Sequence, residues 1–226
     1  MAIDGSTLDM PDEAPNAERY GYPPAARGAS AFPRLRFVAM AECGTHILCY
    51  ATPGRHEQSE RELARPVIAH ADASMLVTAG RGFYSYDFWK EANATGARLL
   101  FRLSRTPILP REEILPDGSC LSTVYPSTVD RKQQRHGIRV RVIDYALRGI
   151  PDAESSYRLI TNWLDPMESP ALELAALYHQ RWTIESSFDE LKTHLADRRV
   201  VLRSKRPSWL NRSSMPSCWS MLLSAI

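Results

Sequence analysis

The segment 170–195 carries two overlapping periodic patterns, and these constrain the fold of this 226-residue chain more than any other feature. Apolar residues recur at helical spacing, namely Leu177, Ile184, Phe188, Leu191 and Leu195. Such a stripe must face a core. Ser169 and Pro170 are typical of an N-cap and a first helical residue, and Glu173 lies in the first turn, where the helix dipole favours negative charge. We therefore predict a helix from about Pro170 to Leu195.

A polar quartet runs along the margin of this stripe: Tyr178, Arg181, Glu185 and Lys192. At about 100° per residue, its members fall within a sector roughly 60° wide. One interpretation is an ordinary surface ion pair between Arg181 and Glu185, worth about 0.3–0.5 kcal/mol. The other is a chemical site, in which Glu185 binds metal, Arg181 and Lys192 hold phosphates, and Tyr178 donates a hydrogen bond to a nucleic-acid backbone. The spacing alone does not decide between them.

Here the sequence resembles a known family, the insertion-sequence DDE transposases. The polar quartet stands at the Tyr-x2-Arg-x3-Glu-x6-Lys spacing of that family, and the surrounding YHQRWTIESSFDELKTHL is similar to its catalytic helix throughout. The segment AIDGSTLDMPDEAPNAERYG, which begins at Ala2, resembles the first catalytic segment, with Asp4 as the first carboxylate. LVTAGRGFYSYDFW resembles the second segment. The resemblance extends to about Lys205.

The second segment departs from the family pattern where a metal ligand is expected. The family reads Ala-Asp-Arg-Gly-Phe, whereas this chain has Gly80 in place of the aspartate. The resemblance implies a two-metal site for Mg²⁺ or Mn²⁺ with Asp4 and Glu185 as catalytic ligands, and a glycine leaves that site incomplete. Asp72 precedes the expected strand and Asp87 follows the turn, so neither is an obvious replacement. We predict a transposase-type fold with strongly reduced or absent catalysis.

The order of elements fits an α/β fold of the RNase H-like type, in which helices flank a mixed sheet and a β-rich insertion precedes the catalytic helix. The expected elements are a short first strand at 1–4, a hairpin at 35–41 and 46–51, helices at 57–70 and 86–93, and strands at 75–79 and 98–103. Residues 11–33 are expected to form a connection. We expect a first part of the core at 1–103, an insertion at 104–165, the catalytic helix and end of the core at 166–205, and a divergent, truncated tail at 206–226. The architecture implies that Asp4 and Glu185 meet at one sheet edge.

The insertion contains short β-like segments, LSTVY, IRVRVIDYAL and SYRLITNWL, which are separated by prolines. The resemblance implies that an aromatic residue of such an insertion can stack on a base flipped from a transposon end, and Tyr157 is the candidate for this DNA contact. The alternative is that Tyr157 packs against a neighbouring strand.

Charge and composition fit a DNA-associated, cytoplasmic protein without requiring one. The net charge of +2 is too small to indicate nucleic-acid binding. Only the distribution of basic residues along the chain can indicate it. Two basic clusters stand out: Arg131, Lys132, Arg135, Arg139 and Arg141, and Arg198, Arg199, Arg203, Lys205 and Arg206. Each is either a solvated face or a set of phosphate contacts. The four cysteines lack zinc-site spacing and are expected to be free thiols, and we expect neither a membrane span nor a secretion signal.

Three hypotheses follow. The first is a DDE transposase that binds transposon ends and target DNA, acts as a homodimer on DNA, and is impaired at Gly80. The second is a non-catalytic DNA-binding or dimerising remnant of such an enzyme. The third is an unrelated α/β interaction protein whose helix matches the motif by chance. The resemblance also implies that the chain lacks the helical N-terminal domain with which relatives recognise transposon ends.

Overall fold

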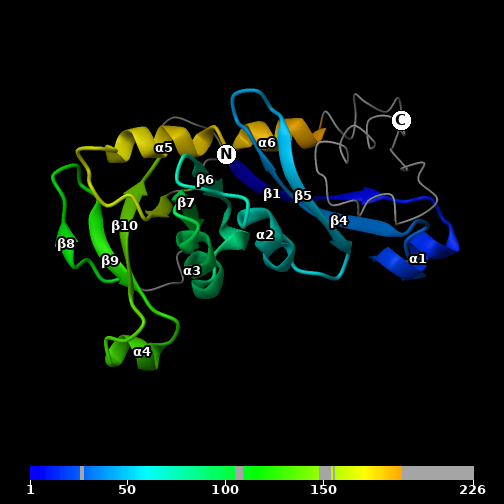
Figure 1. Cartoon of the computed structure of the whole chain (residues 1–226), viewed down its shortest axis with the longest axis horizontal. Coiled ribbons are helices and arrows are strands. Elements are labelled where there is room, and N and C mark those ends of the chain that lie inside the picture. Colours follow the sequence, from blue (N-terminus) through cyan, green and yellow to red (C-terminus); the bar gives the residue numbers. More distant parts are fainter. Residues whose placement is uncertain (26–27, 105–108, 148–153, 155, 190–226) are drawn as a thin grey trace. The chain divides into compact units, whose positions relative to one another are not determined.

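The computed structural model describes residues 1–25, 28–104, 109–147, 154 and 156–189 (Figure 1). The chain divides into two compact units, each described by itself below. The first comprises residues 2–67 and the chain from 182 onward, and the second comprises Met1 and residues 68–181. Within the described ranges, no helix is long and apolar enough to cross a membrane.

The first unit is built on an antiparallel sheet in which β4 lies between β1 and β5. Its strands are β1 (Ala2–Asp9), β4 (Arg34–Ala41) and β5 (Leu48–Arg55). The predicted hairpin is therefore confirmed as β4 and β5. The expectation of a first strand limited to residues 1–4 was wrong, because β1 pairs with β4 along its whole length, from Ala2 opposite Ala41 to Asp9 opposite Arg34.

Shorter elements complete this unit. The segment 11–33, expected to be a plain connection, contains α1 (Ala14–Tyr20) and a small antiparallel pair, β2 (Pro24–Ala25) and β3 (Gly28–Ala29). The helix predicted at 57–70 is present as α2 (Glu60–Ile68). Its apolar residues are buried: Leu63, Ala64, Val67 and Ile68.

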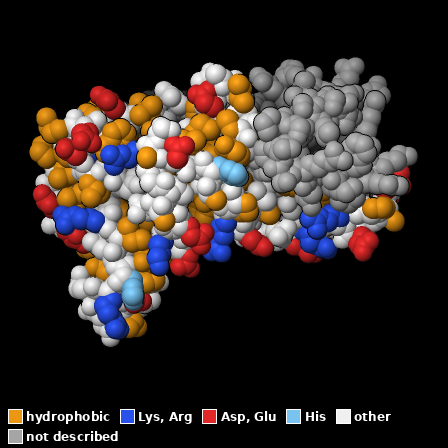
Figure 2. Space-filling view, viewed as in Figure 1, with side chains coloured by type: hydrophobic (Ala, Val, Ile, Leu, Met, Phe, Trp, Pro, Cys, Tyr) orange, Lys and Arg blue, Asp and Glu red, His pale blue; other side chains and the backbone are white. Residues whose placement is uncertain are grey.

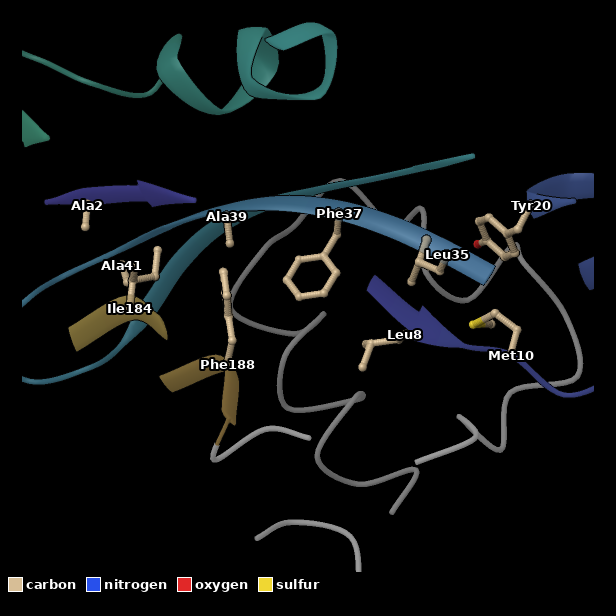
Figure 3. Packing of buried hydrophobic residues seen from close by; sticks show 10 residues of the cluster. All are labelled: Ala2, Leu8, Met10, Tyr20, Leu35, Phe37, Ala39, Ala41, Ile184 and Phe188. Atoms are coloured by element: carbon tan, nitrogen blue, oxygen red, sulfur yellow. The ribbon is translucent and has the colours of Figure 1, made fainter. Parts of the chain in front are cut away.

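One face of the sheet forms a core against α6 (Trp182–Asp189), as Figures 1 and 3 show. Alternate residues of β4 point to this face, as the two-residue period of a strand requires. The core consists of Ala2, Leu8, Met10, Tyr20, Leu35, Phe37, Ala39, Ala41, Ile184 and Phe188. The Phe37 and Phe188 rings meet edge to face with centroids 5.2 Å apart. Ile184 and Phe188 thus fix the rotation of α6.

The second unit contains a mixed sheet with the order β6-β7-β11-β10-β9-β8. Its strands are β6 (Leu76–Ala79), β7 (Arg98–Leu103), β8 (Glu113–Ile114), β9 (Cys120–Val124), β10 (Ile138–Tyr145) and β11 (Tyr157–Thr161). β6 and β7 are parallel, and the other pairs are antiparallel. The three strands predicted in the insertion are present, and β11 joins them to β7. The Met1 ammonium group donates a hydrogen bond to the Leu76 carbonyl at 2.7 Å.

The helices of this unit are η1 (Arg81–Phe83), α3 (Tyr86–Ala94), α4 (Thr128–Lys132) and α5 (Ala171–His179). Ser85 caps α3, since its side chain accepts a hydrogen bond from the Phe88 amide at 3.2 Å. Trp89 of this helix packs edge to face on Phe101 of β7, with centroids 5.2 Å apart. The predicted helix at 86–93 and strands at 75–79 and 98–103 are confirmed.

The single helix predicted at 170–195 is interrupted, which is a correction. It consists of α5 and α6, which Gln180 and Arg181 separate, and residues beyond 189 lie outside the described part. The amides of Gln180 and Arg181 bond to carbonyls three residues back, at 3.1 Å each, as in a tightened last helical turn. The division between the two units also falls here.

The predicted N-cap at Ser169 was also wrong. The helix begins one residue later than expected, with Pro170 at the cap position and no capping bond from its own side chain. Instead, the Asp117 carboxylate accepts a hydrogen bond from the Ala171 amide at 2.8 Å. A distant acidic side chain therefore satisfies the helix terminus, where negative charge is favoured.

Candidate active site

Asp4 and Glu185 lie on two elements of the first unit that pack together. Asp4 stands opposite Ala39 in the β1–β4 ladder, and directly paired residues share one face of a sheet. Ala39 belongs to the core that Ile184 covers, so the Asp4 side chain lies on the face that α6 packs against. Glu185 follows Ile184 on that helix and is partly buried. The fold therefore brings these two predicted site residues to one face.

Another carboxylate, Glu60 of α2, approaches Gly5 of β1 on the face of the sheet opposite to Asp4 and α6, because successive residues of a strand point to opposite faces. A Cβ atom placed on Gly5 would lie 2.8 Å from both Cδ and Oε1 of Glu60, so its carboxyl group rests against the backbone beside Asp4. Burial raises the pKa of Glu60, the negative charge of Asp4 raises it further, and Arg36 lowers it. The signal in the sequence was Gly5 itself, because a glycine within a strand often marks a close approach of another group.

Gly80 lies in the second unit, between the end of β6 and the start of η1. Its backbone has φ −74° and ψ 174°, which any residue can adopt, so the conformation does not require glycine. A Cβ atom placed here would lie 3.9 Å from Cζ of Arg181, an ordinary van der Waals distance. The structure therefore has room for a Cβ atom at residue 80, so neither the backbone nor the first side-chain atom excludes the aspartate of the family pattern.

The two nearby aspartates do not occupy that position. Asp72 precedes β6, whereas Gly80 follows it, so the whole strand separates them. The Asp72 carboxylate accepts hydrogen bonds from the Ser74 hydroxyl at 2.5 Å and the Ser74 amide at 2.8 Å, and these bonds lower its pKa. Asp87 is exposed in the first turn of α3.

Tyr178 and Arg181 adjoin each other in the second unit. The Tyr178 side chain is 2% exposed and packs in a core with Leu100, Ile143, Leu159 and Leu174. Arg181 is 9% exposed, and its Cζ atom lies 5.9 Å from the centroid of the Tyr178 ring. The ring thus supports the guanidinium group. The DNA contacts predicted for both residues stay predictions.

Tyr157 forms part of an aromatic cluster across β10 and β11. Its ring stacks on that of Tyr145, directly opposite in the ladder, with centroids 5.2 Å apart and an interplanar angle of 17°. Cζ of Arg102 lies 4.4 Å from the Tyr157 centroid, and the Arg102 guanidinium pairs with Glu154 at 2.6 Å. Burial and then the charge of Arg102 lower the pKa of neighbouring His179. These contacts match the packing alternative, while base stacking by Tyr157 remains a prediction.

For one member of the first basic cluster, Arg141, both interpretations were wrong, because it is neither a solvated residue nor a phosphate contact. Arg141 is fully buried and cannot contact phosphate. Its guanidinium donates to the Ser169 carbonyl at 2.7 Å and to the Ser119 hydroxyl at 2.8 Å, and it pairs with Asp117. Arg139 pairs with Glu113 at 3.2 Å. On the face drawn in Figure 2, the described basic and acidic side chains are interspersed. The second cluster and Lys192 lie outside the described residues.

The donor chemistry fits a divalent cation only in part. Carboxylate oxygens are the ligands that Mg²⁺ and Mn²⁺ prefer, and Asp4 and Glu185 supply them. Gly80 supplies none. Within the described ranges, no three His, Cys, Asp or Glu side chains converge as a ready-made metal site.

These features define a class: a mixed α/β domain with one acidic side chain on its first strand and another on a late helix. The chain matches the family of the transposase DDE domain over residues 1–210, and it belongs to that family. The predicted recognition and the RNase H-like fold class are thereby confirmed.

Two relatives from Escherichia coli (strain K12) are similar to this chain. One is the transposase InsG for insertion sequence element IS4, with 26% identity over 228 residues, covering 99% of this chain and 50% of that protein. The other is the putative transposase InsZ, with 26% identity over 160 residues, covering 70% of this chain and 52% of that protein. The chain therefore spans about half the length of the curated relatives it matches.

Proposed function

We propose that this chain is a DDE-type transposase domain whose catalytic activity is impaired at Gly80. The observation that carries the proposal is the placement of Asp4 and Glu185 on β1 and α6, which pack together within a domain of the transposase DDE family. The family implies dependence on a divalent metal. We assign Asp4 and Glu185 as the ligands for Mg²⁺ or Mn²⁺ and as the catalytic carboxylates. Bound ions would supply activation of the attacking oxygen and stabilisation of the leaving oxygen.

The impairment follows from the missing carboxylate. Two-metal phosphoryl transfer uses oxygen ligands to hold both ions in register with the scissile phosphate. Gly80 removes one ligand, while Asp72 and Asp87 are placed elsewhere. With the third ligand absent, we expect DNA cleavage and strand transfer by this chain to be weak or undetectable.

The partner we propose is DNA, both the ends of an element and a target. In this role Arg181 and Lys192 hold backbone phosphates, Tyr178 supports Arg181 and donates to the backbone, and Tyr157 stacks on a displaced base. A homodimer on two element ends is the expected assembly, and the cytoplasm is the expected compartment. Because phosphate contacts release counterions, DNA binding should weaken steeply with salt.

A second candidate is a non-catalytic remnant that binds DNA or dimerises. The glycine at residue 80 favours it, because one carboxylate of the family's metal site is missing while Arg181 lies beside that position. In this role Arg181 and Lys192 would bind DNA phosphates without a metal ion. Salt-sensitive DNA binding that does not change on removal of divalent ions would support this alternative.

The deciding experiment compares three proteins in Mn²⁺-dependent cleavage and strand transfer on DNA that carries the element's ends. They are the chain itself, Gly80→Asp, and Gly80→Asp combined with Glu185→Ala. We expect activity only in Gly80→Asp. Strong strand transfer by the unaltered chain would refute the impairment, and a folded but inert Gly80→Asp protein would favour the remnant.

A further inference from the structure

Glu154 joins two arginines of the second unit through one carboxyl group. One of its oxygens lies 2.6 Å from a terminal nitrogen of Arg102, and the same carboxyl group lies 3.4 Å from a terminal nitrogen of Arg81. The two arginines come from different elements, Arg81 from η1 and Arg102 from β7. Among the described residues, no other acidic side chain forms an ion pair with either of them. A single carboxylate therefore bridges two cations.

Arg102 is held in place by its surroundings. Its side chain is only 14% exposed, and its Cζ atom lies 4.4 Å from the centroid of the Tyr157 ring. Its Nε atom is buried and has no hydrogen-bond partner in the part of the chain that the structure describes. The Glu154 amide donates to the Tyr157 hydroxyl at 3.4 Å. A guanidinium group fixed against an aromatic ring is pre-organised for an anion, because little side-chain freedom remains to be lost on binding.

The positive charge around these arginines exceeds what one carboxylate can balance. Arg81 directly follows Gly80, and Cζ of Arg181 lies 3.9 Å from the Cβ position of residue 80. Arg102 joins this group through the shared contact with Glu154. Since residue 80 is a glycine, it adds no negative charge. The arrangement therefore favours a further anion beside Arg81 and Arg102.

We propose that Arg81 and Arg102 form a phosphate-binding site for DNA, and that Glu154 occupies this site while DNA is absent. A carboxylate and a phosphodiester both offer two oxygens that accept hydrogen bonds from guanidinium groups, so one can replace the other. The phosphodiester binds as the Glu154 carboxylate leaves, because the two anions repel each other. Glu154 thus weakens DNA binding by competition within the chain. The inference rests on the proposed function, since the phosphate belongs to the DNA partner proposed there.

The same unit contains a matched ion-pair cluster for comparison. Asp144 lies 2.7 Å from Arg158 and 3.7 Å from Arg111, so it also bridges two arginines. Asp144 and Glu154 are both exposed. Asp144→Asn and Glu154→Gln remove the same charge, and each releases two arginines. A general effect of charge on DNA binding should therefore be similar in the two variants.

The test is DNA binding by the full chain, measured as the fluorescence anisotropy of a labelled duplex of arbitrary sequence at low salt without divalent ions. We expect Glu154→Gln to tighten binding about threefold to tenfold, because it removes a competitor at least as strong as a surface ion pair. Asp144→Asn should tighten binding less than about twofold, since a charge away from the site acts only through screened long-range attraction. Circular dichroism shows whether both variants are folded.

Arg81→Gln connects the gain to the proposed site. Arg81 is exposed, so its replacement should leave the fold intact. It should weaken DNA binding and reduce the slope of log affinity against log salt concentration by about 0.9, the value for one phosphate contact on a duplex. In combination with Arg81→Gln, Glu154→Gln should improve binding clearly less than it does alone, because one of the two arginines that it releases is then missing.

Two results would overturn the inference. If Glu154→Gln tightens DNA binding no more than Asp144→Asn does, Glu154 does not compete with DNA at this site. If the gain from Glu154→Gln is the same with and without Arg81→Gln, the gain comes from net charge alone. A folded chain that binds no DNA even at low salt would instead refute the DNA partner of the proposed function, and this inference with it.

Discussion

The guanidinium carbon of Arg181 lies 3.9 Å from the position that a Cβ atom would take on Gly80. This places one cation of the polar quartet beside the residue at which the chain departs from its family. An aspartate here would face a positive charge at short range while adopting an ordinary backbone conformation. The chain therefore lacks the aspartate side chain at residue 80, although the backbone conformation and the neighbouring Arg181 would both favour an acidic residue there.

Gly80→Asp should consequently stabilise the protein as well as restore a ligand. Gly80→Asn is the matched control, since both changes reduce the freedom of the unfolded chain by a similar amount, about 0.4–1 kcal/mol. We expect Gly80→Asp to exceed Gly80→Asn by up to about 1 kcal/mol in the free energy of unfolding at low salt. Urea titration at two salt concentrations measures this difference, which should shrink at high salt. A Gly80→Asp protein less stable than Gly80→Asn would mean that Arg181 does not face residue 80.

Phe188→Ala tests whether α6 is fixed to the sheet by the packing described. The Phe188 ring is 4% exposed and meets Phe37 edge to face, so its removal should cost about 3–5 kcal/mol in the free energy of unfolding. Trp182→Ala is the control on the same helix, because Trp182 is 58% exposed and should change stability by no more than about 0.5 kcal/mol.

The same pair of variants reports on the site. Since α6 carries Glu185, a poorly docked helix should also weaken Mn²⁺ binding in folded Phe188→Ala protein, while Trp182→Ala should bind normally. Equal losses of stability in the two variants, measured by chemical denaturation, would contradict the docking of α6 on β1 and β4.

Much of the fold was predictable because its signals are local. The hairpin of β4 and β5 and the strands β6 and β7 followed from apolar runs between turn residues. The interruption at Gln180 was not visible, because apolar residues keep helical spacing on both sides of it. The break is only two residues long, and the amides of both residues still bond to carbonyls three residues back, so the spacing of the apolar residues does not change.

The errors concern contacts between residues distant in the chain. Ser169 has the chemistry of an N-cap, but Asp117, 54 residues before Ala171, accepts the hydrogen bond from the Ala171 amide. Arg141 was grouped with its basic neighbours, although its partners come from segments 22 and 28 residues away. Of the candidate site, Asp4 and Glu185 followed from motif spacing, whereas the contact of Glu60 with Gly5 depends on how α2 packs against β1. Sequence spacing reports none of these partners.

Asp117 provides a prediction for the pH dependence of stability. Burial acts to raise the pKa of this carboxyl, but hydrogen bonds from Ser119 and Ala171 and the charge of Arg141 outweigh it, and the pKa is lowered. A lowered pKa in the folded state contributes stability above the pKa of the unfolded chain, and that stability is lost as the pH falls through the folded value. The contribution should thus be complete at neutral pH and disappear in acid.

Asp117→Asn should therefore lower the free energy of unfolding at neutral pH by about 1–3 kcal/mol, since Arg141 loses its charged partner while the amide oxygen can still accept from Ala171. The deficit relative to the unaltered chain should narrow as the pH is lowered, because the carboxyl of the unaltered chain becomes neutral as well. Denaturant unfolding across a series of pH values measures this convergence. Asp87→Asn is the control, because Asp87 is exposed on α3. A deficit that stays constant down to acid pH would show that the charge of Asp117 contributes nothing, and that only the shape of its side chain is needed.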